Sequence, residues 1–416
     1  MDEVGDQLVP TGTRLVHIGP PKTGTTAIQK ALLKRRADLG EYGVAFPGPG
    51  TRPRAAGWAV IGGGVPRGRV QPTMDAWYAL VDEVESAGNN RVVVSNESFA
   101  DADADAAKTI VDGLGGERIQ VVHTVRRLDK LLNSHWQQRV RAGLTVAYDE
   151  WLQVVLGEPD PHNRHWWGFW RHHDLAAVVD RWVDAAGGDK VRLVIADETD
   201  HELLPRVFEC FLGLPERFLH PDPDPANRSM SLNEIEMMRR LHAIGHEAGW
   251  SDQVFRAILR FGVVDELKGL PQDPNDCRID LPGWAAKRAA EINDERIEYV
   301  RSLGTRVVGD PERLRTAPSD TEPLDTADVR VSTQVAARAT AAAIAAGERR
   351  TEKVQKAADR QLASQRSAAK DAREAASVLE ARLATMRNVH AMTSRELVGE
   401  LRGRVIARVK RSRVKA

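Results

Sequence analysis

All 22 aromatic residues and all 21 prolines of this 416-residue chain lie before Val331. Aromatic side chains build cores and prolines mark turns, so only the first 330 residues have the means to form a globular body. The charges divide at the same place. Residues 331–416 hold 19 basic and 8 acidic side chains, whereas residues 1–330 hold 40 basic and 51 acidic ones. The formal net charge of zero is therefore the sum of an acidic body and a basic tail.

Short apolar runs alternate with helical patterns in the body. The runs that predict strands are 14–18, 43–46, 91–95, 119–125 and 191–196. The patterns that predict helices are 25–39, 76–86, 106–114, 128–141 and 175–186. Apolar strands that alternate with helices are typical of a parallel sheet covered on both faces. We therefore expect an α/β three-layer sandwich with a central parallel sheet, followed by a C-terminal helical tail.

Composition sets the expected boundaries. Polar residues 1–13 predict a flexible leader, residues 14–308 the α/β domain, and residues 309–330, rich in Pro, Asp, Thr and Ser, a linker. Residues 331–416 predict an Ala-rich helix. Its weak apolar seam between Val378 and Leu401 fits a short coiled coil and a solitary helix equally well, so both alternatives stay open.

Several classes of protein are disfavoured by the same composition. Two cysteines exclude a disulfide framework and a four-cysteine zinc site. The chain has no apolar run of about 18 residues, and its first residues lack the pattern of a secretory signal. We therefore expect a cytoplasmic protein, with peripheral membrane attachment through the tail as a further expectation.

The segment HIGPPKTGTTAIQ, residues 17–29, joins the first predicted strand to the first predicted helix. A helix N-terminus offers free N–H groups and the positive end of the helix dipole, so it binds anions. Gly24 allows close approach of the backbone, Lys22 adds a charge, and Thr25 and Thr26 add hydroxyl donors. A nucleoside-triphosphate loop needs lysine where Thr25 stands. This mismatch argues against a kinase or NTPase, which is kept as the alternative function.

About a hundred residues later, the segment VVHTVRRLDKLLNSHW holds an Arg-Ser pair that by itself indicates no more than a solvated helix face. Arg126 follows a predicted strand, and Ser134 lies eight residues further on. On a helix this spacing is about two turns, so the two side chains lie near one face. Arg127 with Asn133 is the alternative pair.

The Pro-Lys-Thr-Gly-Thr-Thr order and the Arg126–Ser134 pair together resemble the sulfotransferases that use 3′-phosphoadenosine 5′-phosphosulfate (PAPS), over residues 14–230. The resemblance implies a P-loop-like fold, PAPS as co-substrate and no metal. It implies that the 3′-phosphate binds Arg126 and Ser134. The residues implied to hold the 5′-phosphosulfate are Pro21, Lys22, Thr23, Gly24, Thr25 and Thr26.

Transfer of a sulfuryl group to a hydroxyl needs a base. Glu97 follows the strand predicted at 91–95, so it is expected at the same sheet edge as the loop. Carbohydrate-type members of the family use a glutamate, which implies Glu97 as base beside Lys22 as the catalytic cation. His123 is the reserve base, and a helix cap is the alternative role of Glu97. The expected acceptor is a hydroxyl-bearing glycan or glycolipid.

Two further features leave alternatives open. The segment HNRHWWGFWRHH, residues 162–173, has no standard zinc spacing, so its aromatic side chains predict a core edge or a stacking surface for the acceptor. Residues 402–416 carry seven basic side chains and no acidic one. They predict contact with an anionic membrane or a solvated end, with nucleic acid less favoured. The helical tail also allows oligomerisation. The remaining alternative function is a scaffold without activity that binds 3′-phosphoadenosine 5′-phosphate (PAP), which is PAPS without its sulfuryl group.

Overall fold

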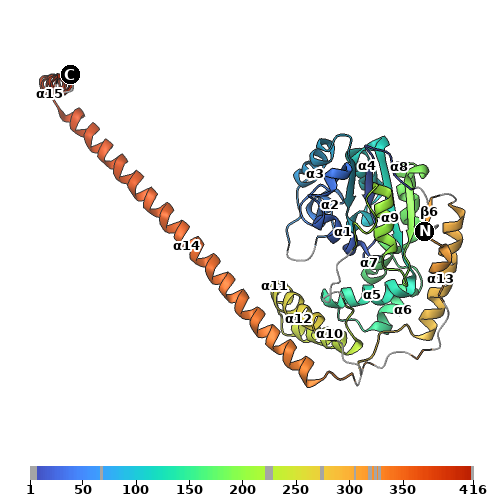
Figure 1. Cartoon of the computed structure of the whole chain (residues 1–416). Helices are drawn as coiled ribbons and strands as arrows, with labels where there is room; N and C mark the ends of the chain where they lie inside the picture. Colours follow the sequence, from blue (N-terminus) through green and yellow to red (C-terminus); the bar gives the residue numbers. More distant parts are fainter. Residues whose placement is uncertain are drawn as a thin grey trace. The chain divides into compact units, whose positions relative to one another are not determined.

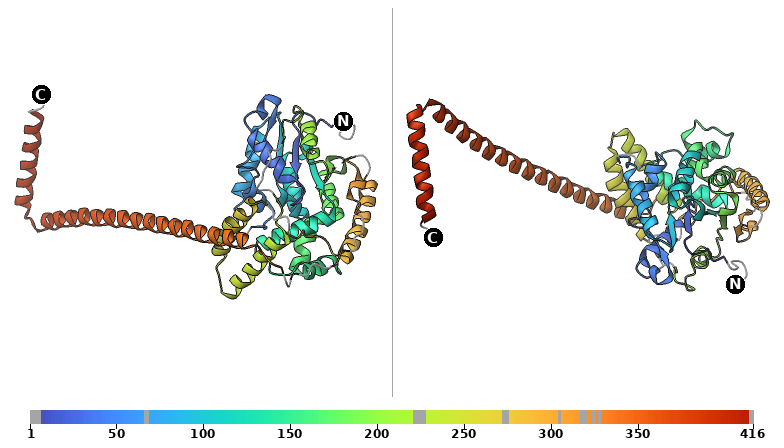
Figure 2. Two further views of the ribbon diagram at one scale, coloured as in Figure 1. Left: turned by 60° about the horizontal axis from the view of Figure 1, so that its bottom comes forward. Right: turned by 90° about the horizontal axis from the view of Figure 1, so that it is seen from above.

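The computed structural model describes residues 7–65, 69–220, 228–271, 276–303, 306–316, 321–322, 326 and 329–413 (Figures 1 and 2). The chain divides into two compact units, Met1–Ala346 and Gly347–Ala416. Residues 1–6 of the predicted leader and residues 317–320, 323–325 and 327–328 of the predicted linker lie outside the described residues. None of the described helices combines the length and the apolar character needed to cross a membrane.

Unit 1 is built on a six-stranded sheet of order β2-β3-β1-β4-β5-β6. All five strand pairings are parallel. The strands are β1 Arg14–His17, β2 Val44–Ala45, β3 Arg91–Ser95, β4 Ile119–Val125, β5 Val191–Ile195 and β6 Val307–Val308. The predicted α/β fold with a central parallel sheet and a C-terminal helical part is confirmed.

Helices connect the strands and extend beyond them. In unit 1 they are α1 Thr25–Lys34, α2 Arg54–Val60, α3 Asp75–Ser86, α4 Ala104–Leu114, α5 Leu128–Arg141, α6 Tyr148–Leu156, α7 Arg164–His173, α8 Leu175–Ala186, α9 Leu203–Leu212, α10 Leu232–Glu247, α11 Asp252–Val254, α12 Val264–Gly269 and α13 Gly283–Ser302. Short 3-10 helices are η1 Leu39–Tyr42, η2 Glu97–Asp101, η3 Gly116–Arg118, η4 Gly188–Lys190 and η7 Pro311–Leu314, and η6 Phe255–Val263 is a π-helix.

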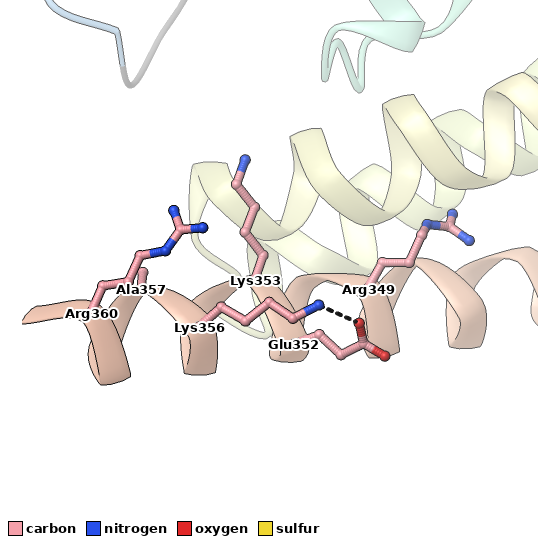
Figure 3. A pocket seen from close by; sticks show the side chains of 6 residues that line it. All are labelled: Arg349, Glu352, Lys353, Lys356, Ala357 and Arg360. Carbon is pink, nitrogen blue, oxygen red and sulfur yellow. Dashed lines mark hydrogen bonds and ion pairs between the residues drawn. The ribbon is translucent and has the colours of Figure 1, made fainter. Parts of the chain in front are cut away.

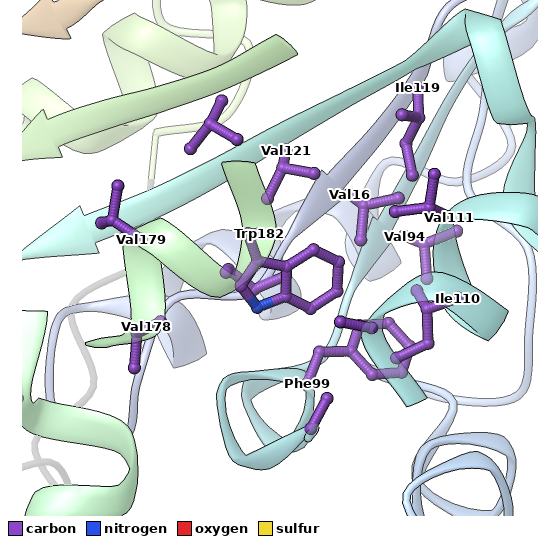
Figure 4. Packing of buried hydrophobic residues seen from close by; sticks show 14 of the residues in the cluster. Val16, Val94, Phe99, Ile110, Val111, Ile119, Val121, Val178, Val179 and Trp182 are labelled. Carbon is purple, nitrogen blue, oxygen red and sulfur yellow. The ribbon is translucent and has the colours of Figure 1, made fainter. Parts of the chain in front are cut away.

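The two faces of the sheet carry separate cores, because successive strand residues point to opposite sides. On one face, Val16 and Val121 pack with Phe99 and with Trp182 of α8 (Figure 4). On the other, Leu15, Val93 and Val122 pack with side chains of α1 and α9. Burial on both faces explains why β3 and β4 contain consecutive valines, 92–94 and 121–122, rather than a strict alternation of apolar and polar residues.

A third core lies mainly between helices and includes part of the aromatic segment of α7. It joins side chains of α5, α6, α7, α10 and α13, with Trp136, Trp151 and Phe169 fully buried. Trp170 packs against this cluster, whereas Trp167 is 51% exposed. The segment thus contributes both to the core and to the surface.

The C-terminal part consists of α14 Thr333–Ala391 and α15 Ser394–Arg413. The first turns of α14 belong to unit 1, where Ala339 and Ala346 are buried. In unit 2, every residue from 351 to 388 is exposed. Side chains such as Arg349, Lys353 and Arg360 extend from α14, where Lys356 lies 3.5 Å from Glu352 (Figure 3). The predicted apolar seam crosses the break between the two helices.

Candidate active site

Four strands end at one edge of the sheet and bring the candidate residues there. The segment 18–24 follows β1, Glu97 follows β3, Arg126 follows β4, and Glu198 follows β5. The central strand β1 lies between β3 and β4, where the direction of strand succession reverses. In open parallel sheets, this switch point at the carboxyl ends is where ligands bind.

A buried histidine fixes the base of the loop after β1. His17 Nδ1 lies 2.9 Å from Ser95 Oγ, and its Nε2 lies 3.1 Å from Thr124 Oγ1, so the ring connects three neighbouring strands. Burial lowers the pKa of His17 to about 3, which keeps the ring neutral. A Cβ on Gly19 would lie 2.4 Å from His17 Nε2, so the position above the ring requires glycine.

The loop turns into α1 through left-handed backbone conformations at two positions. Gly24, the N-cap of α1, has φ 89°, and Lys22 has φ 77°. For a residue with a side chain this conformation costs on the order of 1 kcal/mol, and such strain is often retained at binding sites. Thr23 Oγ1 donates to the Pro20 carbonyl at 2.8 Å. The N–H groups of the first turn, where Thr26 is exposed, are directed outward along the helix axis.

Arg126 connects this loop to the end of β4. Its NH1 group donates to the carbonyl oxygen of Lys22 at 2.6 Å. Its Nε and NH2 groups donate to Glu198 Oε1 and Oε2 at 2.6 and 2.8 Å. Burial would raise the pKa of Glu198, but the hydrogen bonds and charge of Arg126 hold it below its ordinary value. These contacts use three of the five N–H donors of the guanidinium and leave two for a ligand.

The side chains of the alternative pair, Arg127 and Asn133, already form hydrogen bonds within the fold. Arg127 donates through Nε and NH2 to both carboxylate oxygens of Asp129, at 3.1 and 2.7 Å. Asn133 donates to the Ile279 carbonyl at 2.8 Å and accepts a hydrogen bond from the Tyr148 hydroxyl. Ser134 is half-buried on α5 and has no hydrogen-bond partner within the described part of the chain. Its hydroxyl therefore stays available, unlike the amide of Asn133.

Glu97 is hydrogen-bonded to the loop. Thr25 Oγ1 donates to Glu97 Oε2 at 3.3 Å, and Arg52 forms an ion pair with the same carboxylate. The N-cap of η2 is Asn96, whose Oδ1 accepts from Ser98 N at 3.1 Å, so Glu97 does not cap this helix. The Glu97 side chain is 19% exposed, which lets a ligand at the sheet edge reach it.

His123, the reserve base, lies inside β4 and is 3% exposed. Burial first, and then the charge of Arg296, lowers its pKa to about 3. Its Nδ1 is buried without a hydrogen-bond partner among the described residues. A ring with so low a pKa and so little exposure is a weak acceptor for a substrate proton.

Positive charge gathers around the loop although the body is acidic overall. Burial first, and then Arg141, Arg126 and Lys268, lowers the pKa of Lys22 to about 8, while Glu97 opposes the shift. Around Arg54, burial and the charges of Arg52, Arg69 and Arg260 likewise lower the guanidinium pKa. Cations held this close favour an anionic ligand, which would relieve their mutual repulsion. Sequence analysis missed Arg52, Arg141, Arg260 and Lys268, because no local motif marks them.

Comparison with known proteins adds little to this geometry. No family model matches the chain, and no curated protein matches it. Among solved structures, the chain is similar to a sulfotransferase from Alicyclobacillus acidocaldarius, with 18% sequence identity and a TM-score of 0.36. The match covers 57% of this chain and 94% of that one. The case for a function therefore has to come from the site itself.

Proposed function

We propose that this protein is a sulfotransferase that moves a sulfuryl group from PAPS to a hydroxyl of an acceptor. The observation that carries the proposal is the 2.6 Å hydrogen bond from Arg126 to the Lys22 carbonyl. It joins two segments about a hundred residues apart into one site with two anion-binding ends. PAPS carries anionic groups at both its 3′ and 5′ positions, so it needs such a pair.

Each end has donors of the right kind. Lys22, the N–H groups of Gly24 to Thr26 and the threonine hydroxyls hold the 5′-phosphosulfate at the start of α1. The two remaining guanidinium N–H groups of Arg126 and the hydroxyl of Ser134 hold the 3′-phosphate. An anion bound beside Lys22 offsets its burial and its cationic neighbours, and so favours the charged amine.

Glu97 accepts the proton of the acceptor hydroxyl as the acceptor oxygen attacks the sulfuryl sulfur. The bond between sulfur and the bridging oxygen breaks, and that oxygen leaves with the 5′-phosphate of PAP. Lys22 and the N–H groups of α1 stabilise the charge that develops on this phosphate. By analogy with phosphoryl transfer, the rest of the catalysis is positioning.

We propose a glycan or glycolipid as the acceptor, and the basic surroundings refine its class. Arg52 contacts Glu97, and the charges of Arg54 and Arg260 act close by. These side chains favour an acceptor that carries a phosphate, carboxylate or sulfate group over a neutral phenol. A transfer assay with labelled PAPS, run on matched neutral and anionic glycans, glycolipids and phenols, tests this choice.

Lys22→Ala tests the nucleotide site. The variant lacks the positive charge that contacts the phosphosulfate. We therefore expect it to abolish PAP binding in calorimetry and sulfuryl transfer in the labelled assay. Lys108→Ala, at an exposed position of α4, is the matched control. Intact transfer in Lys22→Ala would contradict the proposal. Thermal shifts with PAP, and with ATP plus magnesium, separate this function from a kinase or NTPase.

Glu97→Gln tests the base. The amide keeps the shape of the side chain but cannot accept the proton, so we expect turnover to fall by about 10²–10⁴-fold with PAP affinity unchanged. Glu216→Gln, at an exposed position, should leave turnover as it is. Normal turnover in Glu97→Gln places the base elsewhere. Tight PAP binding with no transfer to any acceptor in the wild type would favour the scaffold alternative.

A further inference from the structure

Three histidine side chains from two helices meet inside unit 1. His135 belongs to α5, and His172 and His173 end α7. Each offers a ring nitrogen, and these three atoms lie within 4.8 Å of one another. The exposed fractions of the three residues are 4%, 4% and 2%, so bulk water does not solvate the rings.

The polar atoms of this cluster lack partners. Nδ1 of His135, Nε2 of His172 and both ring nitrogens of His173 are buried without a hydrogen-bond partner among the described residues. Leaving a buried polar group unsatisfied costs about 1–3 kcal/mol, so four in one place call for a ligand. Trp151 and Phe169 pack against His135 with ring centroids 5.9 and 5.1 Å away, so they supply no polar partner.

Asp101 orients one of the rings. It accepts a hydrogen bond from Nδ1 of His172 at 2.9 Å and pairs with Arg171 at 3.1 Å. A carboxylate on one imidazole nitrogen fixes the tautomer and leaves the other nitrogen, here Nε2, as a ligand atom. The carboxylate also supplies the negative charge nearest to the cluster.

The surroundings of the rings restrict which metal could bind. Only a neutral imidazole has the free lone pair that a metal requires, and all three rings are buried away from bulk water. Arg171, which pairs with Asp101 at 3.1 Å, weakens the attraction for any metal ion, so a metal with strong affinity for nitrogen is needed.

We propose that His135, His172 and His173 bind one divalent transition-metal ion, for which zinc is the best fit. Imidazole nitrogen suits zinc and related metals, whereas calcium and magnesium require oxygen ligands. Zinc binds nitrogen at about 2.0–2.1 Å, which sets tetrahedral ligand atoms about 3.4 Å apart. The ligand nitrogens lie within 4.8 Å of one another, so each pair has to approach by at most about 1.4 Å to reach this spacing when zinc binds.

The ion would act as a positioning element and would not touch the reacting atoms. It would tie α5, which carries Ser134 next to His135, to the end of α7. Through Asp101 it would also hold the end of η2, which begins with Glu97. The proposal replaces the expectation of a metal-free protein, and it stands whether or not the protein transfers sulfuryl groups.

Metal binding by the wild type is the first test. The untagged full chain is stripped with a chelator and titrated with Zn²⁺ and with Co²⁺, whose visible absorption reports tetrahedral coordination. We expect one ion per chain and a rise in the melting temperature of the stripped protein on addition of zinc. A flat titration with no change in melting temperature, as ordered water in the cluster would give, overturns the proposal.

Variants test the ligand set. We expect His172→Gln and His173→Gln to lose the cobalt spectrum, and Asp101→Asn to weaken zinc binding by about 10–100-fold. His242→Gln is the matched control, because His242 is buried with both ring nitrogens unpartnered but lies outside the cluster. If His172→Gln does not fold, the Asp101→Asn titration still decides. An unchanged zinc affinity in Asp101→Asn, or loss of the cobalt spectrum in His242→Gln as well, overturns the assignment of the ligands. PAP binding is measured on the same variants as a separate quantity.

Discussion

The two units of the chain are stabilised in different ways. Unit 1 encloses three apolar cores, and residues such as Trp182 and Phe208 have no exposed surface. In unit 2 the residues 351–388 are all exposed, and the helices rely on their own backbone hydrogen bonds. Neighbouring charges one turn apart, such as Glu400 and Arg404 at 2.7 Å, add a few tenths of a kcal/mol each. Within the described residues, buried and oriented polar groups of the kind that a site needs lie in unit 1.

The largest difference between the units should appear in the free energy of unfolding. Trp182→Ala opens a cavity in a core and should cost about 3–5 kcal/mol, whereas Leu383→Ala, at a position 50% exposed, should change it by less than about 0.5 kcal/mol. Tryptophan fluorescence follows the denaturant unfolding of unit 1, because all ten tryptophans lie before Val331, and far-ultraviolet circular dichroism follows the helices of both units. A comparable loss in both variants would mean that the tail packs against a partner copy.

Acid should act on unit 1 through its buried histidines. Burial lowers the pKa of His17 and of His123 to about 3, whereas an unfolded histidine titrates near about 6.5. Between these values only the unfolded chain takes up the protons, so the free energy of unfolding falls as the pH falls below about 6. The slope is about 1.4 kcal/mol per pH unit for each histidine.

Unfolding curves at a series of pH values from 7 to 4 measure this slope by tryptophan fluorescence. His123→Asn should reduce it, and His201→Gln, at an exposed position, should not. A free energy of unfolding that stays constant over this range would show that the buried rings are protonated in the folded state.

Removal of unit 2 should have the smallest effect, because we expect PAP binding and sulfuryl transfer to stay unchanged. A chain that ends at Ala346 should keep PAP binding and transfer to a soluble acceptor, because Lys22, Glu97 and Arg126 all lie in unit 1. The cut has to follow Ala346 rather than residue 330, because Ala339 and Ala346 are 6% and 3% exposed. Loss of transfer in the shorter chain would show that unit 2 contributes to the site.

The same pair of chains tests the tail as a membrane-binding segment. We expect the full chain to sediment with anionic vesicles, because the basic end of α15 also exposes Val398, Leu401 and Val405. The chain that ends at Ala346 should stay in solution, and neutral vesicles serve as the control. Equal sedimentation of the two chains would contradict membrane binding by the tail, and light scattering on both shows whether the tail makes the protein oligomeric.

Elements defined by local pattern could be predicted from the sequence. The runs 91–95 and 119–125 are β3 and β4, and 128–141 and 175–186 are α5 and α8 with the same bounds. The two-residue strand β6 was missed, because Val307–Val308 is too short to show a period. Helix α1 ends at Lys34 rather than at Leu39, because its C-cap Arg35 leaves the helical conformation, and η1 begins as a separate 3-10 turn at Leu39.

Contacts between distant segments could not be predicted in the same way. The pairing of Glu198 with Arg126 depends on two parallel strands ending side by side, which no local pattern in the sequence reveals. The cluster of His135 with His172 and His173 depends on how α5 packs near α7. Spacing within residues 162–173 gave no metal pattern, because the third ring comes from another helix.

The hydrogen bond from Arg126 to the Lys22 carbonyl has a thermodynamic consequence. A ligand that draws Arg126 toward itself acts on the backbone of the loop, and an anion held by the loop acts on Arg126 through the same bond. Linkage requires these two influences to be equal in free energy. Fragments that occupy one end of the site should therefore change the affinity of the other end by the same factor in either order of addition.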